Sequence, residues 1–199
     1  MYIPKSFEIN DRDLIFDWME RYSFATLFSQ HNGEPYATHL PLLLKKEEQA
    51  LYGHFARPNG QWKDADHILA VFHGPHSYIS PTWYETEKAV PTWNYVAVHV
   101  YGTLEILEDD QVIFDSLNDS VKKYERSDSP YRLDELEPGF IEGMSKGIVA
   151  FKIHITKMEA KAKLSQNHPV ERQQLVIEQL EKSNDRDDQE IASLMRKNV

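Results

Sequence analysis

Residues 94–107, "NYVAVHVYGTLEIL", carry the clearest strand pattern of the chain. Side chains point alternately to the two sides of a strand, so apolar residues at every second position share one face. That face holds Val96, Val98, Val100, Leu104 and Ile106. The other face carries aromatic and small side chains between Tyr95 and Thr103. We therefore expect both faces to be largely buried, as in a barrel wall that is covered on its outside.

Further strand patterns surround this one. "YSFATLFSQ" and "YATHLPLLL" flank the turn signal "HNGEP" and predict a hairpin over residues 22–44. Other strands are predicted at 49–56, 67–73 and 147–163, and helices at 11–22, within 109–146 and twice within 169–199. Many strands with few short helices, and no regular strand–helix alternation, favour a mainly β, α+β fold with an antiparallel barrel over a doubly wound sheet.

Composition limits the class of protein. The chain has 199 residues, which suits one domain with an appendage, and a net charge of −10, which disfavours extensive contact with nucleic acid. It contains no cysteine, which excludes disulfides and thiolate metal sites and fits a reducing compartment. There is no signal-peptide pattern at the N-terminus and no apolar run long enough to cross a bilayer. We expect a cytoplasmic protein without a membrane partner.

The usual nucleotide-binding motifs are missing: the glycine-rich dinucleotide fingerprint, the P-loop and the nucleophile elbow do not occur. Side chains would therefore have to hold the phosphate of any phosphorylated cofactor. The segment "GHFARPNGQWK", residues 53–63, offers the cations Arg57 and Lys63 and the hydrogen-bonding side chains of His54, Asn59 and Gln61. A short helix predicted to begin near Asn59 would add free backbone N–H groups. The alternative is a turn with solvated charges.

Two later stretches are rich in rings and hydroxyl groups, "HGPHSYISPTWY" at 73–84 and "VPTWNYVAVHVYG" at 90–102. Their aromatic residues pack a core or form a wall beside a planar ligand. The aromatic residues alternate with serine, threonine and asparagine, which a plain core disfavours because each buried polar group needs a partner. The pattern thus leaves both interpretations open, and the alternating polar residues favour a wall beside a ligand.

Histidines and serines give little indication of catalysis. The nine histidines scatter over both faces of the predicted strands, so ring hydrogen bonds inside a barrel are favoured over a metal site. Serines and histidines occur together at 73–80, but no acid is placed by the sequence to orient an imidazole. Polar packing in a turn is favoured there, and no catalytic residue is predicted.

Four segments carry a family resemblance: "GHFARPNGQW", "FHGPHSYISPTWY", "VPTWNYVAVHVYG" and "KLSQN" at 163–167. In this order they resemble the PaiB-type proteins, FMN-binding split-barrel negative transcriptional regulators related to the pyridoxamine-phosphate-oxidase-like flavin proteins. The resemblance extends from "MYIP" to the C-terminal "LMR". It implies a split β-barrel over 1–168, a helical extension over 169–199 packed on the barrel or the dimer, and a homodimer with flavin sites at the subunit interface.

The resemblance also implies the cofactor FMN and its contacts. Segment 54–63 would hold the phosphate and ribityl end, while "THLP" at 38–41, "SYISPTWY" and "TWNY" would lie by the isoalloxazine ring. The implied cofactor-binding residues are Thr38, His39, Leu40, His54, Arg57, Asn59, Gln61, Trp62, Lys63, Ser80, Pro81, Trp83, Trp93 and Asn94. There are two departures. Gly60 stands where the family favours proline, and Tyr124 stands before Glu125 where the family has a histidine whose role does not transfer.

The implied function is negative regulation of genes for protease production and sporulation. Direct DNA binding is not expected, because the sequence shows no basic recognition helix and acids outnumber bases in 169–199. A partner would then carry the effect to the genes. The alternative is a flavin-dependent oxidoreductase or haem-related protein of the same fold, which an open pocket beside the flavin and turnover with a reduced nicotinamide would indicate.

Overall fold

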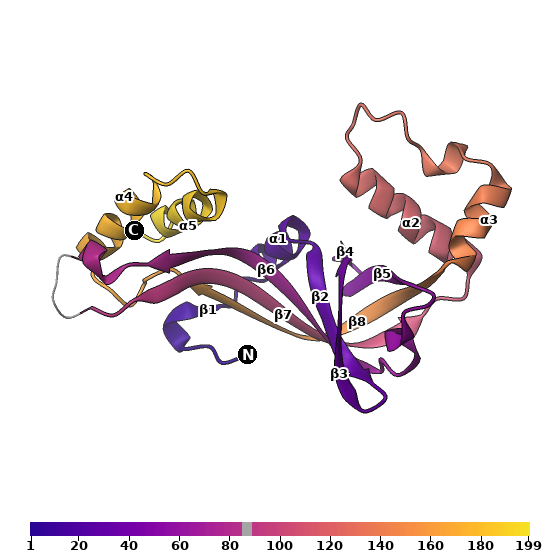
Figure 1. Cartoon of the computed structure of the whole chain (residues 1–199), viewed down its shortest axis with the longest axis horizontal. Helices are drawn as coiled ribbons and strands as arrows, with labels where there is room; N and C mark the ends of the chain where they lie inside the picture. The colour runs from indigo at the N-terminus through magenta and orange to yellow at the C-terminus, as the bar shows by residue number, and fades with distance from the viewer. Residues whose placement is uncertain (85–88) are drawn as a thin grey trace. The chain divides into compact units, whose positions relative to one another are not determined.

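The computed structural model of the chain describes residues 1–84 and 89–199. The chain forms two compact units, each built from segments that are far apart in the sequence (Figure 1). Unit 1 consists of Met1–Trp18, His73–His99 and Glu159–Val199. Unit 2 consists of Met19–Phe72 and Val100–Met158.

Eight strands in the described part of the chain form one sheet. They are β1 (Glu8–Ile9), β2 (Phe24–His31), β3 (Glu34–Pro41), β4 (Leu43–Lys45), β5 (Ala50–Ala56), β6 (His67–Ile79), β7 (Thr92–Ile106) and β8 (Ile148–Lys163). The strand order is β3-β2-β6-β7-β8-β5-β4, with β1 beside β8, and the pairs whose register is defined are antiparallel. The predicted mixed class with an antiparallel sheet is confirmed.

The hairpin predicted over 22–44 is present as β2 and β3. Its turn is Asn32-Gly33, with φ angles of 53° and 79°, and His31 pairs with Glu34 across it. Two consecutive residues with positive φ are typical of a type I′ turn, whose twist matches that of the strands. The segment predicted as one strand after this turn is divided, because the chain breaks between β3 and β4 at the buried Leu42.

The strand of residues 94–107 lies within β7, and its two faces differ. Val96, Val98 and Val100 are buried, as the alternation predicts. On the opposite face Ala97 is buried, whereas Tyr95 and His99 are half-buried. Leu104 and Ile106, which continue the valine face, are half-buried. The expectation that both faces are largely buried therefore holds for the three valines and only in part for the rest of the strand.

The helices α1 and α2 each begin after an aspartate that caps them. α1 (Arg12–Arg21) follows Asp11, whose Oδ1 accepts hydrogen bonds from the backbone N–H groups of residues 13 and 14. The single helical pattern of 109–146 forms two helices, α2 (Asp110–Tyr124) and α3 (Pro138–Lys146). Asp109 caps α2 in the same way. None of the helices in the described ranges is both long and apolar enough to span a membrane.

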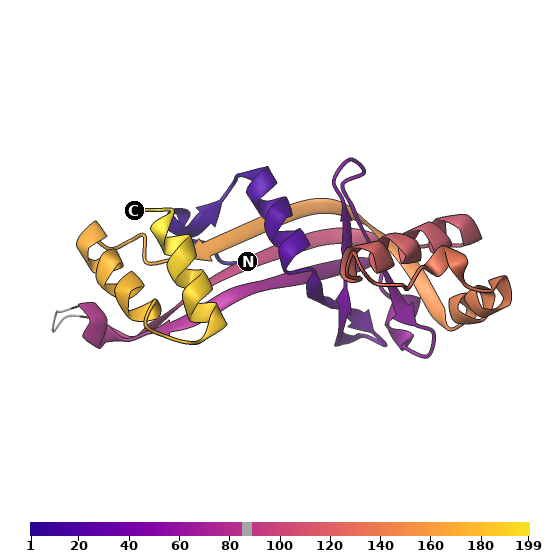
Figure 2. The same cartoon turned by 90° about the horizontal axis from the view of Figure 1, so that it is seen from above.

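Two helices follow the sheet in unit 1, α4 (Val170–Leu180) and α5 (Arg186–Arg196), as predicted. They lie side by side (Figure 2), and each buries an apolar stripe that includes Val176 and Ile177 of α4 and Ile191 and Met195 of α5. The predicted domain boundary after residue 168 stays a prediction. The last segment of unit 1, which contains these helices, begins at Glu159.

Candidate functional site

Two of the predicted cofactor segments meet within unit 2. Thr38 of β3 donates a hydrogen bond from Oγ1 to Oε1 of Gln61 at 2.5 Å, and Asn59 donates from Nδ2 to the Thr38 hydroxyl at 2.9 Å. The Gln61 amide nitrogen also donates to the carbonyl of Leu27 at 3.0 Å and to the hydroxyl of Ser29 at 2.9 Å. Polar side chains of segments 38–41 and 54–63 therefore form one connected network.

Gln61 is fully buried, with 0% of its surface exposed, and its side chain holds neighbouring residues, while its predicted contact with the cofactor stays a prediction. The short helix predicted near Asn59 is the four-residue 3₁₀ helix η2 (Gly60–Lys63). Its first N–H groups were expected to be free for an anion. That expectation is wrong for Gln61, whose backbone N–H donates to Asn59 Oδ1 at 2.9 Å.

Arg57 is exposed and anchored at the same time. Its Nε donates to the carbonyl of Lys146 at 2.6 Å, and its Nη2 donates to the carbonyl of Ile148 at 2.5 Å. A cation is favourable at these carbonyls because they lie at and just beyond the C-terminal end of α3. Of its five N–H donors, three have no partner among the described residues. The guanidinium is thus oriented, with donors remaining for a ligand.

Lys63, the second predicted cation, is exposed and lies with its ammonium 5.8 Å from the centre of the Trp62 ring. Trp62 is half-buried and donates from Nε1 to the carbonyl of Arg57 at 3.3 Å. The neighbouring Asp64 accepts hydrogen bonds from the backbone of Asn32 and from the His31 ring, which lower the pKa of this carboxyl group. Lys63 therefore has an ionised carboxylate as its neighbour. We call Thr38, Arg57, Asn59, Gln61 and Lys63 the Arg57 cluster.

The departure at Gly60 has a packing reason. A Cβ atom at this position would lie 2.5 Å from Nε2 of His31, whose ring is in turn held by a 2.7 Å bond to Asp64. Any residue with a side chain, proline included, would have to displace that ring. In this chain His31 takes the space that a proline would need.

The segment "THLP" does not present one face. Thr38 and Leu40 point to the side where Leu40 is buried, whereas His39 and Pro41 lie on the exposed side. His39 Nδ1 contacts the hydroxyl of Thr26 at 2.9 Å, and exposed aromatic rings of β2 lie on the same side, namely Phe24 (66% exposed) and Phe28. His54 on β5 is half-buried, and burial lowers the pKa of its imidazole.

In unit 1 the structure brings "TWN" at 92–94 and "KLSQN" at 163–167 together. Asn94 is fully buried and donates from Nδ2 to the Ser165 hydroxyl at 3.0 Å and to the sulfur of Met195 at 3.5 Å. Lys163 donates from Nζ to the carbonyl of Trp93 at 2.7 Å and to the hydroxyl of Thr92. Asn94, predicted to bind the cofactor, thus joins β7 to the turn after β8 and to α5.

The remaining predicted residues lie around a tight turn after β6. The Ser80 hydroxyl contacts the Thr82 hydroxyl at 2.8 Å, and Pro81 opens the 3₁₀ helix η3 (Pro81–Tyr84), in which Trp83 is half-buried. Trp93 is 52% exposed and packs edge-on against Tyr78, with ring centres 5.8 Å apart. Of these residues, Trp93 presents the largest ring surface to a ligand.

The serine–histidine stretch does find an acid, which corrects one expectation. Nδ1 of His76 lies 3.1 Å from a carboxylate oxygen of Asp187, more than a hundred residues later in α5. The adjacent Ser77 donates its hydroxyl proton to Asp188 at 2.5 Å instead of to the imidazole. These contacts dock α5 onto β6, and they do not form a serine–histidine–aspartate relay.

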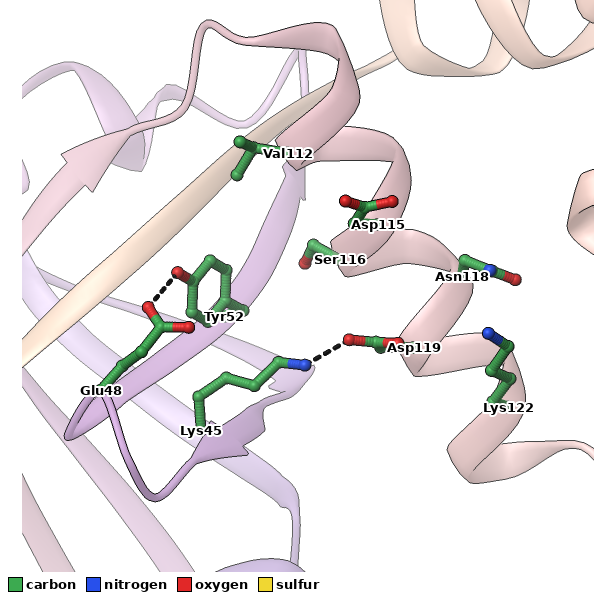
Figure 3. A pocket seen from close by; sticks show the side chains of 9 residues that line it. All are labelled: Lys45, Glu48, Tyr52, Val112, Asp115, Ser116, Asn118, Asp119 and Lys122. Carbon is green, nitrogen blue, oxygen red and sulfur yellow. Dashed lines mark hydrogen bonds and ion pairs between the residues drawn. The ribbon is translucent and has the colours of Figure 1, made fainter.

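A cavity of about 470 Å³ in unit 2 was not indicated by the sequence (Figure 3). It lies between β4–β5 and α2, where Lys45 pairs with Asp119 and Tyr52 donates to Glu48 at 2.6 Å. Hydrogen bonds from Lys152 and Tyr52 lower the pKa of Glu48. None of the predicted cofactor residues lines this cavity, so it is separate from the Arg57 cluster.

Comparison with known proteins places the chain in a family. Residues 1–157 match the family model described as "Putative FMN-binding domain". The chain is 41% identical over 201 residues to the "Protease synthase and sporulation protein PAI 2" of Bacillus subtilis, covering 98% of this chain and 96% of that protein.

Solved structures support the fold at low sequence identity. The flavocytochrome Anf3 from Azotobacter vinelandii matches with a TM-score of 0.64 and 15% identity, over 81% of this chain and 72% of that chain. A conserved protein from Mycobacterium tuberculosis matches with a TM-score of 0.60 and 13% identity, over 85% and 94%. The predicted split-barrel fold and the predicted cofactor class, FMN, are confirmed. The chain therefore belongs to the family of PaiB-type FMN-binding proteins that its motifs resemble.

Proposed function

We propose that this protein is a cytoplasmic FMN-binding homodimer that acts as a negative regulator of protease production and sporulation genes. The link to protease production and sporulation is supported by the name of its relative in Bacillus subtilis, to which it is 41% identical over almost the full length of both chains. Negative regulation is what the family resemblance implies. The observation that carries FMN binding is Arg57, an exposed guanidinium that is held in place and keeps unused donors.

The residues of the Arg57 cluster fit a phosphate group. A phosphate monoester carries close to two negative charges, and a chain with a net charge of −10 repels it unless local cations offset the field. Arg57 and Lys63 supply that charge, and the fixed backbone bonds of Arg57 reduce the entropy lost when it binds. Thr38 and Asn59 are already connected to each other and shape the cluster beside them.

The flat part of FMN needs apolar surface, and each unit offers some. In unit 2 the exposed side of the hairpin carries Phe24, Phe28 and His39, and in unit 1 the indole of Trp93 is exposed beside Tyr78. When bound, FMN supplies a redox-active ring. Large apolar side chains that remain exposed in one chain also suit burial against a second copy, which supports the homodimer.

Regulation through a partner is favoured over direct reading of DNA. The C-terminal helix α5 is tied down by Asp187 and Asp188, and its apolar stripe is buried, so it does not stand free as a recognition helix. The acidic balance of the chain opposes contact with phosphate backbones. A mobility-shift assay at physiological salt that shows tight, sequence-selective binding would contradict this part of the proposal.

Fluorescence titration tests FMN binding. The parent chain should quench FMN fluorescence, and Arg57→Ala should weaken FMN binding about 10- to 150-fold, as for a lost charge-assisted hydrogen bond. Arg126→Ala is the matched control, because it removes an arginine that is exposed on the surface of unit 2 and paired only with nearby Asp128 among the described residues. If Arg57→Ala and the parent bind FMN equally, the phosphate does not lie at Arg57.

Complementation tests the regulatory role separately. The chain should restore normal extracellular protease activity and spore counts to Bacillus subtilis cells that lack PAI 2. Arg57→Ala, expressed to the same level, should restore them less well if FMN binding is needed for regulation. Normal FMN binding without any complementation would reject the regulatory role and leave the cofactor assignment intact.

A further inference from the structure

Four basic side chains gather at the end of β8 in unit 1, and we call them the lysine cluster: Lys161, Lys163, His168 and Arg172. Lys161 and Lys163 are two residues apart on the strand and so share one side of it. His168 and Arg172 follow after the "KLSQN" turn, at the start of α4. Lys161 is only 7% exposed, and the other three are half-buried.

The two ammonium groups have only neutral partners among the described residues. Lys163 donates to the carbonyl of Trp93 and the hydroxyl of Thr92. Lys161 donates to the carbonyl of Tyr2 at 3.4 Å and lies 5.1 Å from the ring centre of Tyr95. None of these groups carries a negative charge.

The charges that act most on Lys163 and His168 are positive, while the exposed Glu8 lies opposite Lys161 in the β1–β8 pair. The pKa of Lys163 is lowered by burial and then by the charge of Lys161. The pKa of His168 is lowered by burial and then by the charges of Arg172 and Lys163. No carboxylate among the described residues offsets these two effects. Elsewhere the chain does balance such groups, since Lys152 is held by Glu48 at 2.6 Å.

The backbone that carries Lys163 is held rigidly. Ser165 is buried with φ = 64°, a left-handed conformation that is unusual for a residue other than glycine, and its hydroxyl is bonded to Asn94. The Gln166 amide closes the turn, accepting from the N–H of Leu164 at 2.6 Å and donating to the carbonyl of Ala162 at 2.6 Å. Strained and over-determined turns of this kind are typical of functional sites.

Burying like charges that are bonded only to neutral groups opposes folding, and a bound anion reduces that cost. We propose that the lysine cluster binds an oxyanion, a phosphate or carboxylate group, with Lys163 as the direct donor and the exposed Trp93 indole beside the rest of the ligand. Two sources can supply this group: the phosphate of FMN, or a separate small phosphorylated or carboxylated molecule. The first source rests on the proposed function, and the second does not.

Amine footprinting tests the site on the unmodified protein. The protein is acylated with and without inorganic phosphate, at constant ionic strength adjusted with chloride, and each lysine is quantified by peptide mass spectrometry. Phosphate should protect Lys163 at least severalfold and leave Lys157, on the same strand, unchanged. Phosphate should also raise the melting temperature of the parent chain and of Lys157→Gln, but not of Lys163→Gln. Lys163→Arg, which keeps the charge, should keep the response.

Flavin titrations distinguish the two sources. If the FMN phosphate is the anion, Lys163→Gln should lose about tenfold or more in affinity for FMN and little for riboflavin, which lacks the phosphate. That result would move the phosphate from Arg57 to Lys163. If a separate anion binds, Lys163→Gln should bind both flavins like the parent while phosphate protection is lost. The proposal is overturned if neither phosphate nor FMN protects Lys163 and phosphate stabilises the parent no more than chloride does.

Discussion

The Arg57 cluster of unit 2 and the lysine cluster of unit 1 differ in how their polar groups are paired. In the Arg57 cluster most donors and acceptors are matched within the chain: the side chain of Gln61 makes bonds to three residues, and Arg57 uses two donors on carbonyl groups. In the lysine cluster the hydrogen bonds are also made, but the charges are unbalanced, because Lys161 and Lys163 have no acidic partner among the described residues.

The composition of a motif therefore does not fix its capacity to bind a ligand. The sequence pointed to Arg57 and Lys63 because two cations stand close together in a polar segment. The structure shows that part of this capacity is used internally, on the end of α3. The "KLSQN" motif carries one lysine and does not by itself indicate a cluster of cations. In the folded chain other basic side chains lie close to that lysine.

The largest effect is expected from breaking the network of the Arg57 cluster. Gln61→Ala removes a buried amide and leaves the Leu27 carbonyl and the Ser29 and Thr38 hydroxyl groups without it. The free energy of unfolding in urea should fall by about 2–4 kcal/mol. Gln30→Ala, at an exposed position of the β2–β3 hairpin, serves as the control and should change the free energy of unfolding by less than about 0.5 kcal/mol. Equal effects of the two substitutions would show that the network does not stabilise the fold.

A substitution in the lysine cluster should act in the opposite direction. Lys161→Met replaces a buried ammonium, bonded only to a neutral carbonyl, by an apolar side chain of similar size. We expect the free energy of unfolding to stay equal or rise by about 1 kcal/mol, because the cost of burying the charge disappears. Phosphate should then stabilise the protein less than it stabilises the parent. A loss of stability greater than about 1 kcal/mol would show that the contacts of Lys161 with the tyrosine rings outweigh its burial.

One histidine in each unit, His54 in unit 2 and His168 in unit 1, reports on the effect of phosphate through its pKa. Burial lowers the pKa of both His54 and His168, so the unfolded chain binds more protons, and stability is lost as the pH falls below about 6.5. A bound anion favours protonated imidazole, so phosphate should raise the pKa of His168 and leave that of His54 unchanged. Two-dimensional NMR of the imidazole resonances measures both values in one sample. An equal response of the two histidines would mean that phosphate acts through general screening.

The smallest effect is expected at the cavity between β4 and α2. Asp119→Asn breaks the ion pair with Lys45, whose two side chains are each about one-third exposed. Exposed pairs contribute little, and the free energy of unfolding should change by at most about 1 kcal/mol. Thermal unfolding at low and high salt checks this, because high salt should make the variant and the parent more alike. A larger loss would mean that this pair holds α2 against the sheet.

Local chemistry explains why much of the fold is visible in the sequence. The Asn-Gly turn of the β2–β3 hairpin, the caps at Asp11 and Asp109, and the alternating valines of β7 each depend on residues within a few positions of one another. Turn type, capping and strand faces are properties of short segments, so the sequence alone indicates them. The family motifs are likewise continuous stretches, and they led to the confirmed cofactor class.

Which of these polar residues are buried, and which partners they bond to, depends on how distant segments fold together. The carbonyl that anchors Arg57 lies 89 residues further along the chain, and the acids that hold His76 and Ser77 lie 111 residues further. Asn94 and Gln61 look like ligand contacts in the sequence, but folding buries both completely. Such partners leave no periodic trace, because a hydrogen bond or an uncompensated charge depends on where distant segments meet in space.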